Sequence, residues 1–106
     1  MSLERVIKAL VSLGLSRVYA EIYVYIAKKG PQTVTDLVKT FQYSRNQIYS
    51  ALKNLIMLGL VKKEANLFSV LSFEEALELL IKKSKEQAKY IEQSREELIV
   101  SWKKDS

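Results

Sequence analysis

Apolar residues recur at helical spacing over most of the chain and predict a mostly α-helical protein. The first such run covers residues 3–13, and the Gly14 that follows is typical of a helix end. A second helix is predicted from a cap at Ser16 to the pair Gly30 and Pro31, because proline cannot continue a helix. The first part of the chain is therefore expected to hold two helices.

The next two predicted helices begin with a capping box, in which two side chains each satisfy a free backbone N–H at the helix start. Thr33 and Asp36 have this spacing at the start of a short third helix. Ser44 and Gln47 repeat it at the start of the next helix, which we expect to span about residues 44–58. The apolar stripe of that helix consists of Ile48, Leu52, Leu55, Ile56 and Leu58.

Beyond Gly59, which favours a helix end, the helical spacing gives way to two short β-prone runs, residues 60–63 and 67–71. Asn66 lies between the runs and tolerates the positive φ that a tight turn often needs. We therefore predict a β-hairpin directly after the fourth helix.

A final helix is predicted to begin with a capping box of Ser72 and Glu75 and to run without a break to about Lys104. Some thirty residues give a helix about 45 Å long, which exceeds the width of a ~70-residue domain. Residues in this segment alternate at spacings of four and three, which is typical of a coiled-coil seam. The seam consists of Leu77, Ile81, Ser84, Ala88, Ile91, Arg95, Leu98 and Trp102.

A helix of this length indicates a partner, and we expect a homodimer. The seam could pair with the same helix of a second copy, and an antiparallel contact fits its polar middle better than a long parallel zipper. Alternatively, the helix could pack on the first helix of the partner, through Leu3, Ile7 and Leu10. A third interpretation is that the last helix folds back on its own domain.

Two helices joined by a tight turn, the second followed by a hairpin, describe a winged helix-turn-helix. The predicted fold is therefore mostly α, with a two-stranded hairpin as the wing and a long C-terminal helix. We divide it into a winged helix-turn-helix domain, residues 1–72, and a dimerisation helix, residues 73–106. A homodimer of this kind would bind a roughly palindromic DNA site.

Two stretches, "YAEIYVYIAKKGPQTVTDL" and "SRNQIYSALKNLIMLGLV", resemble the DNA-binding domain of the TrmB-like transcriptional regulators of archaea. The resemblance covers about residues 13–80 and implies binding to double-stranded DNA and a role in transcription regulation. Matching positions are Ala20, Tyr23, Gly30, Pro31, Thr33, Leu37, Ser44, Arg45, Ile48, Tyr49, Leu52, Leu55, Gly59, Leu60, Val61 and residues 74–77.

The sequence departs from the family pattern in three places. Gln42 and Tyr43 stand where many members have a glycine and a hydrophobic residue, and the wing lacks the usual glycine. The larger members carry a C-terminal sugar-binding domain, which we do not expect here. Sugar sensing is therefore not inferred for this chain.

The positive charge is concentrated in one window. Residues 37–63 contain no acidic side chain, and their five cations equal the whole formal charge of +5. Such a window favours an acidic partner such as nucleic acid. The five cations are Lys39, Arg45, Lys53, Lys62 and Lys63.

With the apolar stripe inward, the polar face of the fourth helix is left for a DNA major groove. Arginine pairs with guanine, and asparagine or glutamine pairs with adenine. The candidate contacts on this helix are Arg45, Asn46, Gln47, Tyr49, Ser50 and Lys53. Wing contacts with the backbone or minor groove are expected from Lys62, Lys63 and Asn66, and further phosphate contacts from Thr35, Lys39 and Tyr43.

Plainer interpretations exist for the same residues. Any exposed helix start is polar, Gln47 could serve only as a cap, and Tyr49 could sit half-buried at the edge of the core. Lysines on a wing can simply protect an edge strand. The whole domain could also be a protein–protein adaptor that does not bind DNA.

The residue content argues against most catalytic chemistry. The sequence contains no cysteine and no histidine, which excludes disulfides, thiolate or imidazole catalysis and zinc sites of the usual kind. It shows no carboxylate cluster suited to a hard cation, so we expect no cofactor and no enzyme. No apolar run approaches the ~20 residues of a membrane span, and we expect a cytoplasmic protein.

Overall fold

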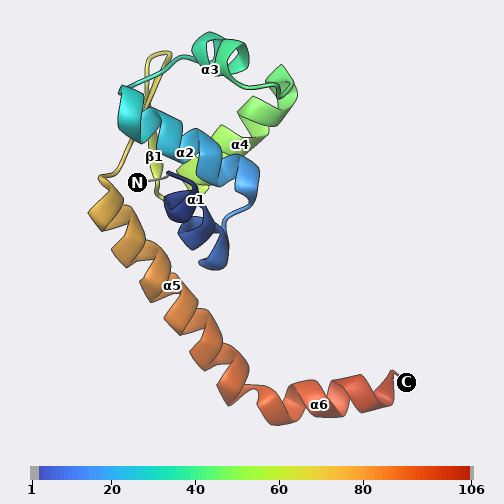
Figure 1. Ribbon diagram of the computed structural model, residues 1–106. Helices are drawn as coiled ribbons and strands as arrows, with labels where there is room; N and C mark the ends of the chain where they lie inside the picture. The colour runs from blue at the N-terminus through green and yellow to red at the C-terminus, as the bar shows by residue number, and fades with distance from the viewer. Residues whose placement is uncertain (1–2, 106) are drawn as a thin grey trace.

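The computed structural model describes residues 3–105, which form a helical body with a projecting C-terminal arm (Figure 1). The described elements are α1 (Leu3–Ser12), α2 (Arg17–Lys29), α3 (Val34–Thr40), α4 (Arg45–Met57), β1 (Val61–Glu64), β2 (Leu67–Val70), α5 (Phe73–Gln93) and α6 (Arg95–Lys104). This order of helices and hairpin confirms the predicted winged helix-turn-helix.

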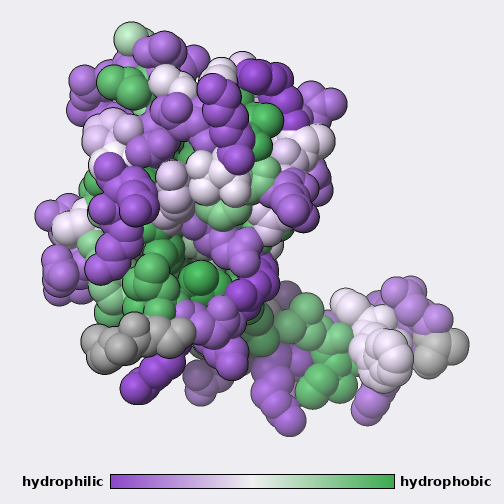
Figure 2. All heavy atoms as spheres, turned by 45° about the horizontal axis from the view of Figure 1, so that its top comes forward, coloured by the Kyte–Doolittle hydropathy of each residue, from purple (hydrophilic) through white to green (hydrophobic). Residues whose placement is uncertain are grey.

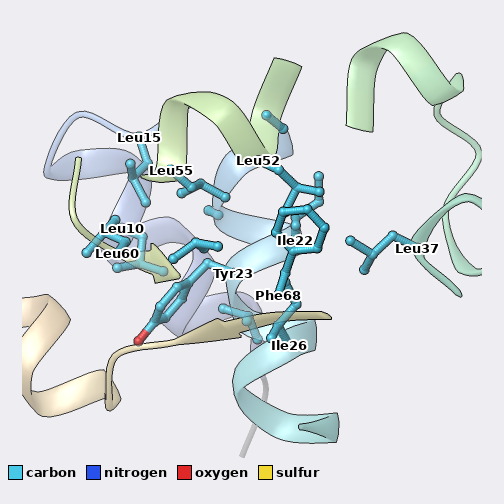
Figure 3. Close-up of a cluster of buried hydrophobic side chains, with 14 of the residues drawn as sticks. Leu10, Leu15, Ile22, Tyr23, Ile26, Leu37, Leu52, Leu55, Leu60 and Phe68 are labelled. Carbon is cyan, nitrogen blue, oxygen red and sulfur yellow. The ribbon is translucent and has the colours of Figure 1, made fainter. Parts of the chain in front are cut away.

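The core surrounds α2, which packs against α1, α4 and β2, while α3 packs against α4. Figure 3 shows side chains from helices and wing converging on it. Ile22, Leu37, Leu52 and Leu55 are all essentially inaccessible to solvent. Of the predicted α4 stripe, Ile48, Leu52 and Leu55 are buried, whereas Leu58 is partly buried and Ile56 is 39% exposed. The polar face opposite the buried residues is left at the surface.

The local signals at the helix starts are confirmed. Thr33 and Asp36 form a reciprocal capping box at α3, and Ser44 and Gln47 form one at α4. At α5 only half of the predicted box is present within residues 3–105: the Ser72 hydroxyl accepts the backbone N–H of Glu75. These caps fix where the short helices begin because they satisfy donors that the helix cannot.

The wing is an antiparallel hairpin in which Val61 pairs with Val70 and Glu64 with Leu67. The positive φ of its turn falls on Ala65, at 55°, and not on Asn66 as predicted. On its other edge, β2 exchanges two backbone hydrogen bonds with Gln32. This contact ties the loop before α3 to the wing and brings the start of α3 next to the hairpin.

The predicted unbroken C-terminal helix is wrong at one point. Ser94 has ψ near 5° instead of a helical value, and the chain turns there into a separate α6 (Figure 1). No side-chain hydrogen bond caps α6 at Ser94. The seam is therefore divided, with Leu77 to Ile91 on α5 and Arg95 to Trp102 on α6.

The assignment of Leu10 to a dimer surface is also wrong, because Leu10 is fully buried in the core of its own chain. Leu3, by contrast, is 43% exposed, and Ile7 is partly buried against the core. Further along, Ala76 and Leu80 belong to the same core, so the first turns of α5 pack on the body. The domain boundary at residue 72 stays a prediction.

None of the helices within residues 3–105 is both long enough and apolar enough to cross a membrane.

Candidate nucleic-acid interface

A shallow hollow of about 180 Å³ lies between the starts of α3 and α4 and the wing. Arg45 and Tyr49 reach it from α4, Thr35 from α3, and Lys63 and Asn66 from the wing. Arg45 and Tyr49 are one helical turn apart, so they share a face of α4. The structure thus brings together five of the predicted contacts from three separate segments.

Three of the other predicted contacts of α4 lie on its other flank. Asn46, Gln47 and Ser50 border a second open hollow, whose far side is formed by Ser16 and Tyr19 at the start of α2. No local pattern predicts α2 beside this face, because the two segments are about thirty residues apart in the chain and are brought together by the packing of the core. We add Ser16 and Tyr19 to the candidate surface.

Gln47 already has a structural role in the free protein. Its side-chain oxygen accepts the Ser44 backbone N–H at 2.8 Å, and its own backbone N–H binds the Ser44 hydroxyl at 3.2 Å. Pairing with adenine needs both the oxygen and the amide of the side chain. In this structure the Gln47 oxygen is therefore already engaged in the cap.

Tyr43 is held by the body of the domain. Its hydroxyl donates a hydrogen bond to the carboxylate of Glu21 on α2, and this bond raises the pKa of Tyr43. Its ring stacks on Phe41 with 5.7 Å between centroids. A phosphate contact would require the hydroxyl to change partner, and the present geometry fixes the turn that leads into α4.

The Glu21 carboxylate also accepts the Arg17 guanidinium, 3.1 Å away. Arg17 in turn makes two hydrogen bonds with Glu4 of α1, at 2.7 and 2.8 Å, which lower the pKa of Glu4 and raise that of Arg17. A polar chain of contacts thus runs from α1 through α2 to Tyr43. Because Arg17 lies beside both carboxylates, it offsets their negative charge close to the turn.

The basic side chains of the window are exposed at the surface. Lys39 and Lys53 lie on the outer faces of α3 and α4. Lys63 places its ammonium 5.7 Å from the centre of the Phe68 ring, a cation–π distance that orients it beside the hollow. Lys62 forms an ion pair with Glu64 at 3.3 Å, but both groups are about three-quarters exposed, so this pair contributes little.

The nearest acidic residue before the window is used locally. The carboxylate of Asp36 accepts the Thr33 backbone N–H at 3.0 Å, and this hydrogen bond lowers the pKa of Asp36. The negative charge sits at the start of α3, where it complements the helix dipole. Glu64 at the wing tip is therefore the acidic group that most directly weakens the positive field.

Residues 3–105 contain no group of three or more acidic residues placed to hold a metal ion. Leu77 and Ser84 of the seam are partly buried in the single chain, whereas the other seam residues are exposed: Ile81 is 37% exposed, Ile91 57%, Leu98 50% and Trp102 75%.

The fold and this surface define a winged-helix protein whose recognition helix presents a polar, cationic face. A sequence profile described as "Sugar-specific transcriptional regulator TrmB" matches residues 10–73. That match covers more than half of the chain, and the protein belongs to the TrmB family of transcriptional regulators. The resemblance read from the two stretches of sequence is thereby confirmed.

No curated protein matches the sequence. Among solved structures, the chain is similar to one titled "Structure of Disulfide formed AbfR", with 18% sequence identity and a TM-score of 0.53. The similarity covers 92% of this chain and 84% of that one, and at this identity it concerns the fold alone. The disulfide in that title has no counterpart here, because this sequence contains no cysteine.

Proposed function

We propose that this protein is a sequence-specific regulator of transcription that binds double-stranded DNA as a homodimer. One observation carries the proposal: Arg45, Tyr49 and Lys63, all within the acid-free window of residues 37–63, border one hollow together with Asn66 of the wing. Family membership supports a role in transcription. The cytoplasm is the expected location, and no catalytic step belongs to the proposal.

In this proposal the start of α4 enters the major groove and the wing lies on the adjacent backbone. Arg45 pairs with a guanine through its planar donor fork, and Asn46 pairs with an adenine. Lys53, Lys62, Lys63, Lys39 and Thr35 contact phosphates, which position the protein without reading sequence. Two copies would present two recognition helices to a near-palindromic site.

The proposal is tested by replacing Arg45 with alanine and comparing duplex sequences selected by the unaltered protein. Loss of a bidentate guanine contact should weaken the binding free energy for the preferred sequence by about 1–3 kcal/mol. It should also relax the base preference at one position of the DNA site. The matched control is Arg5→Ala, which removes the same charge from an exposed position on α1.

Lys63→Ala should instead weaken binding to all duplexes alike, because a phosphate contact carries no sequence information. If Arg45→Ala and Arg5→Ala have equal effects on every duplex, α4 is not the reading helix. If the unaltered protein binds no duplex even at low salt, the protein–protein adaptor becomes the better interpretation.

A further inference from the structure

The C-terminal arm carries apolar side chains that nothing within residues 3–105 covers. No residue of α6 is buried, and Leu98, Val100 and Trp102 are each at least half exposed. Figure 2 shows apolar surface, in green, along the projecting arm. On α5 the exposed apolar residues continue with Ile81 and Ile91. Leu98 and Trp102 are one helical turn apart and form, with Ile81 and Ile91, an apolar face on both helices, whereas Val100 lies on the other side of α6.

We propose that a second copy of this chain covers the face in an antiparallel arrangement, with Ala88 of each copy against the partner's Ile91. This pairing rests on the proposed homodimer and specifies its geometry. The two-fold axis then passes between residues 88 and 91 of α5. An isologous contact of this kind repeats every pair twice, because residue i meets j and j meets i.

The register follows from matching side chains along the seam in opposite directions. With Ala88 against the partner's Ile91, the next layer places Ser84 against the partner's Arg95, two polar groups that can hydrogen-bond. The outer layers place Ile81 against the partner's Leu98 and Leu77 against the partner's Trp102. Every layer thus pairs two apolar side chains or two polar side chains. The exposed apolar side chains of the seam are buried, and no charged side chain stands in an apolar layer.

Charges beside the seam favour the same register. Residues 85 and 92 directly follow the seam positions 84 and 91. In an antiparallel pair, flanking positions of this type on one helix lie next to the same type of position on the other helix. The register places Lys85 next to the partner's Glu92 on both sides of the two-fold axis. Two opposite-charge pairs therefore border the central layer.

Other pairings of the same seam bring like charges together. A parallel in-register pair would place Arg95 directly against the partner's Arg95. An antiparallel pair shifted by one heptad would place Leu77 against Arg95, Glu78 beside Glu92 and Lys85 beside the partner's Lys85. Like charges so close repel, and an arginine against leucine is left without a polar partner.

The bend at Ser94 has a role in this arrangement. The backbone ladder continues through it, since the Ser94 N–H binds the Tyr90 carbonyl at 3.0 Å and the Leu98 N–H binds the Ser94 carbonyl at 3.0 Å. A modest change in the dihedral angles of one residue therefore re-aims α6. In the pair, α6 runs along the first half of the partner's α5, and contact with the partner fixes its direction.

Cysteine cross-linking tests the register directly, because the sequence has no cysteine of its own. In Ile81→Cys/Leu98→Cys the two thiols of one chain lie on different parts of the arm, roughly 25 Å apart if it is straight, so a disulfide can form only between copies. We expect oxidation to give covalent dimers of this variant. Leu98→Cys alone should stay uncross-linked, and so should Ile81→Cys/Ile91→Cys.

The outcomes separate the pairing from the proposed function. Cross-linking of Leu98→Cys alone would overturn the antiparallel direction, and cross-linking of Ile81→Cys/Ile91→Cys would overturn the register. A dimer in sedimentation that none of the variants cross-links would overturn the pairing while the homodimer stands. A monomer in sedimentation would overturn the pairing and the homodimer together, whereas DNA binding is measured separately.

A charge reversal gives an independent measurement that needs no oxidation. Lys85→Glu should weaken dimerisation about two- to thirtyfold, as expected for two exposed ion pairs, because each becomes a repulsive contact. Adding Glu92→Lys should restore the dimerisation constant of the unaltered protein. If the double variant stays as weak as the single one, residues 85 and 92 do not meet across the interface.

Discussion

Replacing Tyr23 with phenylalanine tests how the wing and α5 are attached to the core. The Tyr23 side chain is 1% exposed, and its hydroxyl donates a 2.7 Å hydrogen bond to the backbone carbonyl of Leu71, which links the wing to α5. The phenylalanine ring can fill the same space, so the change removes the hydrogen bond and little else. It leaves the Leu71 carbonyl without this donor at a partly buried site.

A buried carbonyl that loses its partner costs about 1–3 kcal/mol, and a net hydrogen bond contributes about 0.5–1.5 kcal/mol. We therefore expect Tyr23→Phe to lower the free energy of unfolding by about 1–2 kcal/mol at pH 7. For a domain of this size, that loss corresponds to a Tm lower by roughly 4–16 °C. The measurement is urea and thermal unfolding followed by circular dichroism, at matched protein concentration.

The pH dependence adds a second readout. Burial raises the pKa of Tyr23 to about 12, and the carboxylates of Glu74 and Glu75 add to the shift. A group whose pKa is higher in the folded state than in the unfolded state contributes stability that is fully present below the unfolded pKa, here about 10. This contribution is lost as the pH rises through the folded pKa. The difference between the two proteins should therefore be constant up to about pH 10 and shrink above it, since the other tyrosines are common to both.

Tyr49→Phe is the control, because Tyr49 is 51% exposed and its hydroxyl makes no hydrogen bond within residues 3–105. The control should unfold like the unaltered protein at pH 7. If Tyr23→Phe is as stable as Tyr49→Phe at pH 7, the Leu71 contact does not hold the wing in place. A stability difference that persists unchanged at high pH would also refute the reasoning.

Four further variants separate folding from binding. Leu52→Ala, at a fully buried position, should cost about 2–5 kcal/mol in urea unfolding, whereas Lys53→Ala beside it should change stability by less than about 0.5 kcal/mol and weaken DNA binding. Glu64→Gln removes the ion-pair partner of Lys62 and should strengthen duplex binding by up to about 1 kcal/mol, measured by fluorescence anisotropy. Unchanged binding would show that the wing does not approach DNA. Ser44→Ala should cost about 0.5–2 kcal/mol because it removes the α4 cap, and an unchanged Tm would contradict that.

The elements that sequence reasoning placed correctly are those controlled by local physics. The caps at Thr33 and Ser44 depend on residues three positions apart, and the stripe of α4 depends on helical spacing. Both can be read without knowing the rest of the fold. The polar face of α4 followed in the same way, as the side that the stripe leaves outside.

The features that were missed depend on contacts between distant segments or on small backbone preferences. Leu10 has the same spacing as exposed apolar residues of α1, and only the packing of α1 on α2 decides that it is buried. The contact between Tyr43 and Glu21 spans 22 positions and leaves no local signal. At the wing turn, Ala65 rather than Asn66 takes the positive φ, and at Ser94 a single residue leaves the helical conformation.

The most direct test of the central claim is duplex-DNA affinity of the unaltered chain measured against salt concentration. The four exposed lysines per chain that contact phosphates in this proposal predict a log–log slope of about −3.6 per chain, from about −0.9 per neutralised phosphate. We expect tight binding at low salt, a steep negative slope and a smaller slope for Lys63→Ala. A protein that binds no duplex at low salt, or whose affinity does not change with salt, would contradict the account.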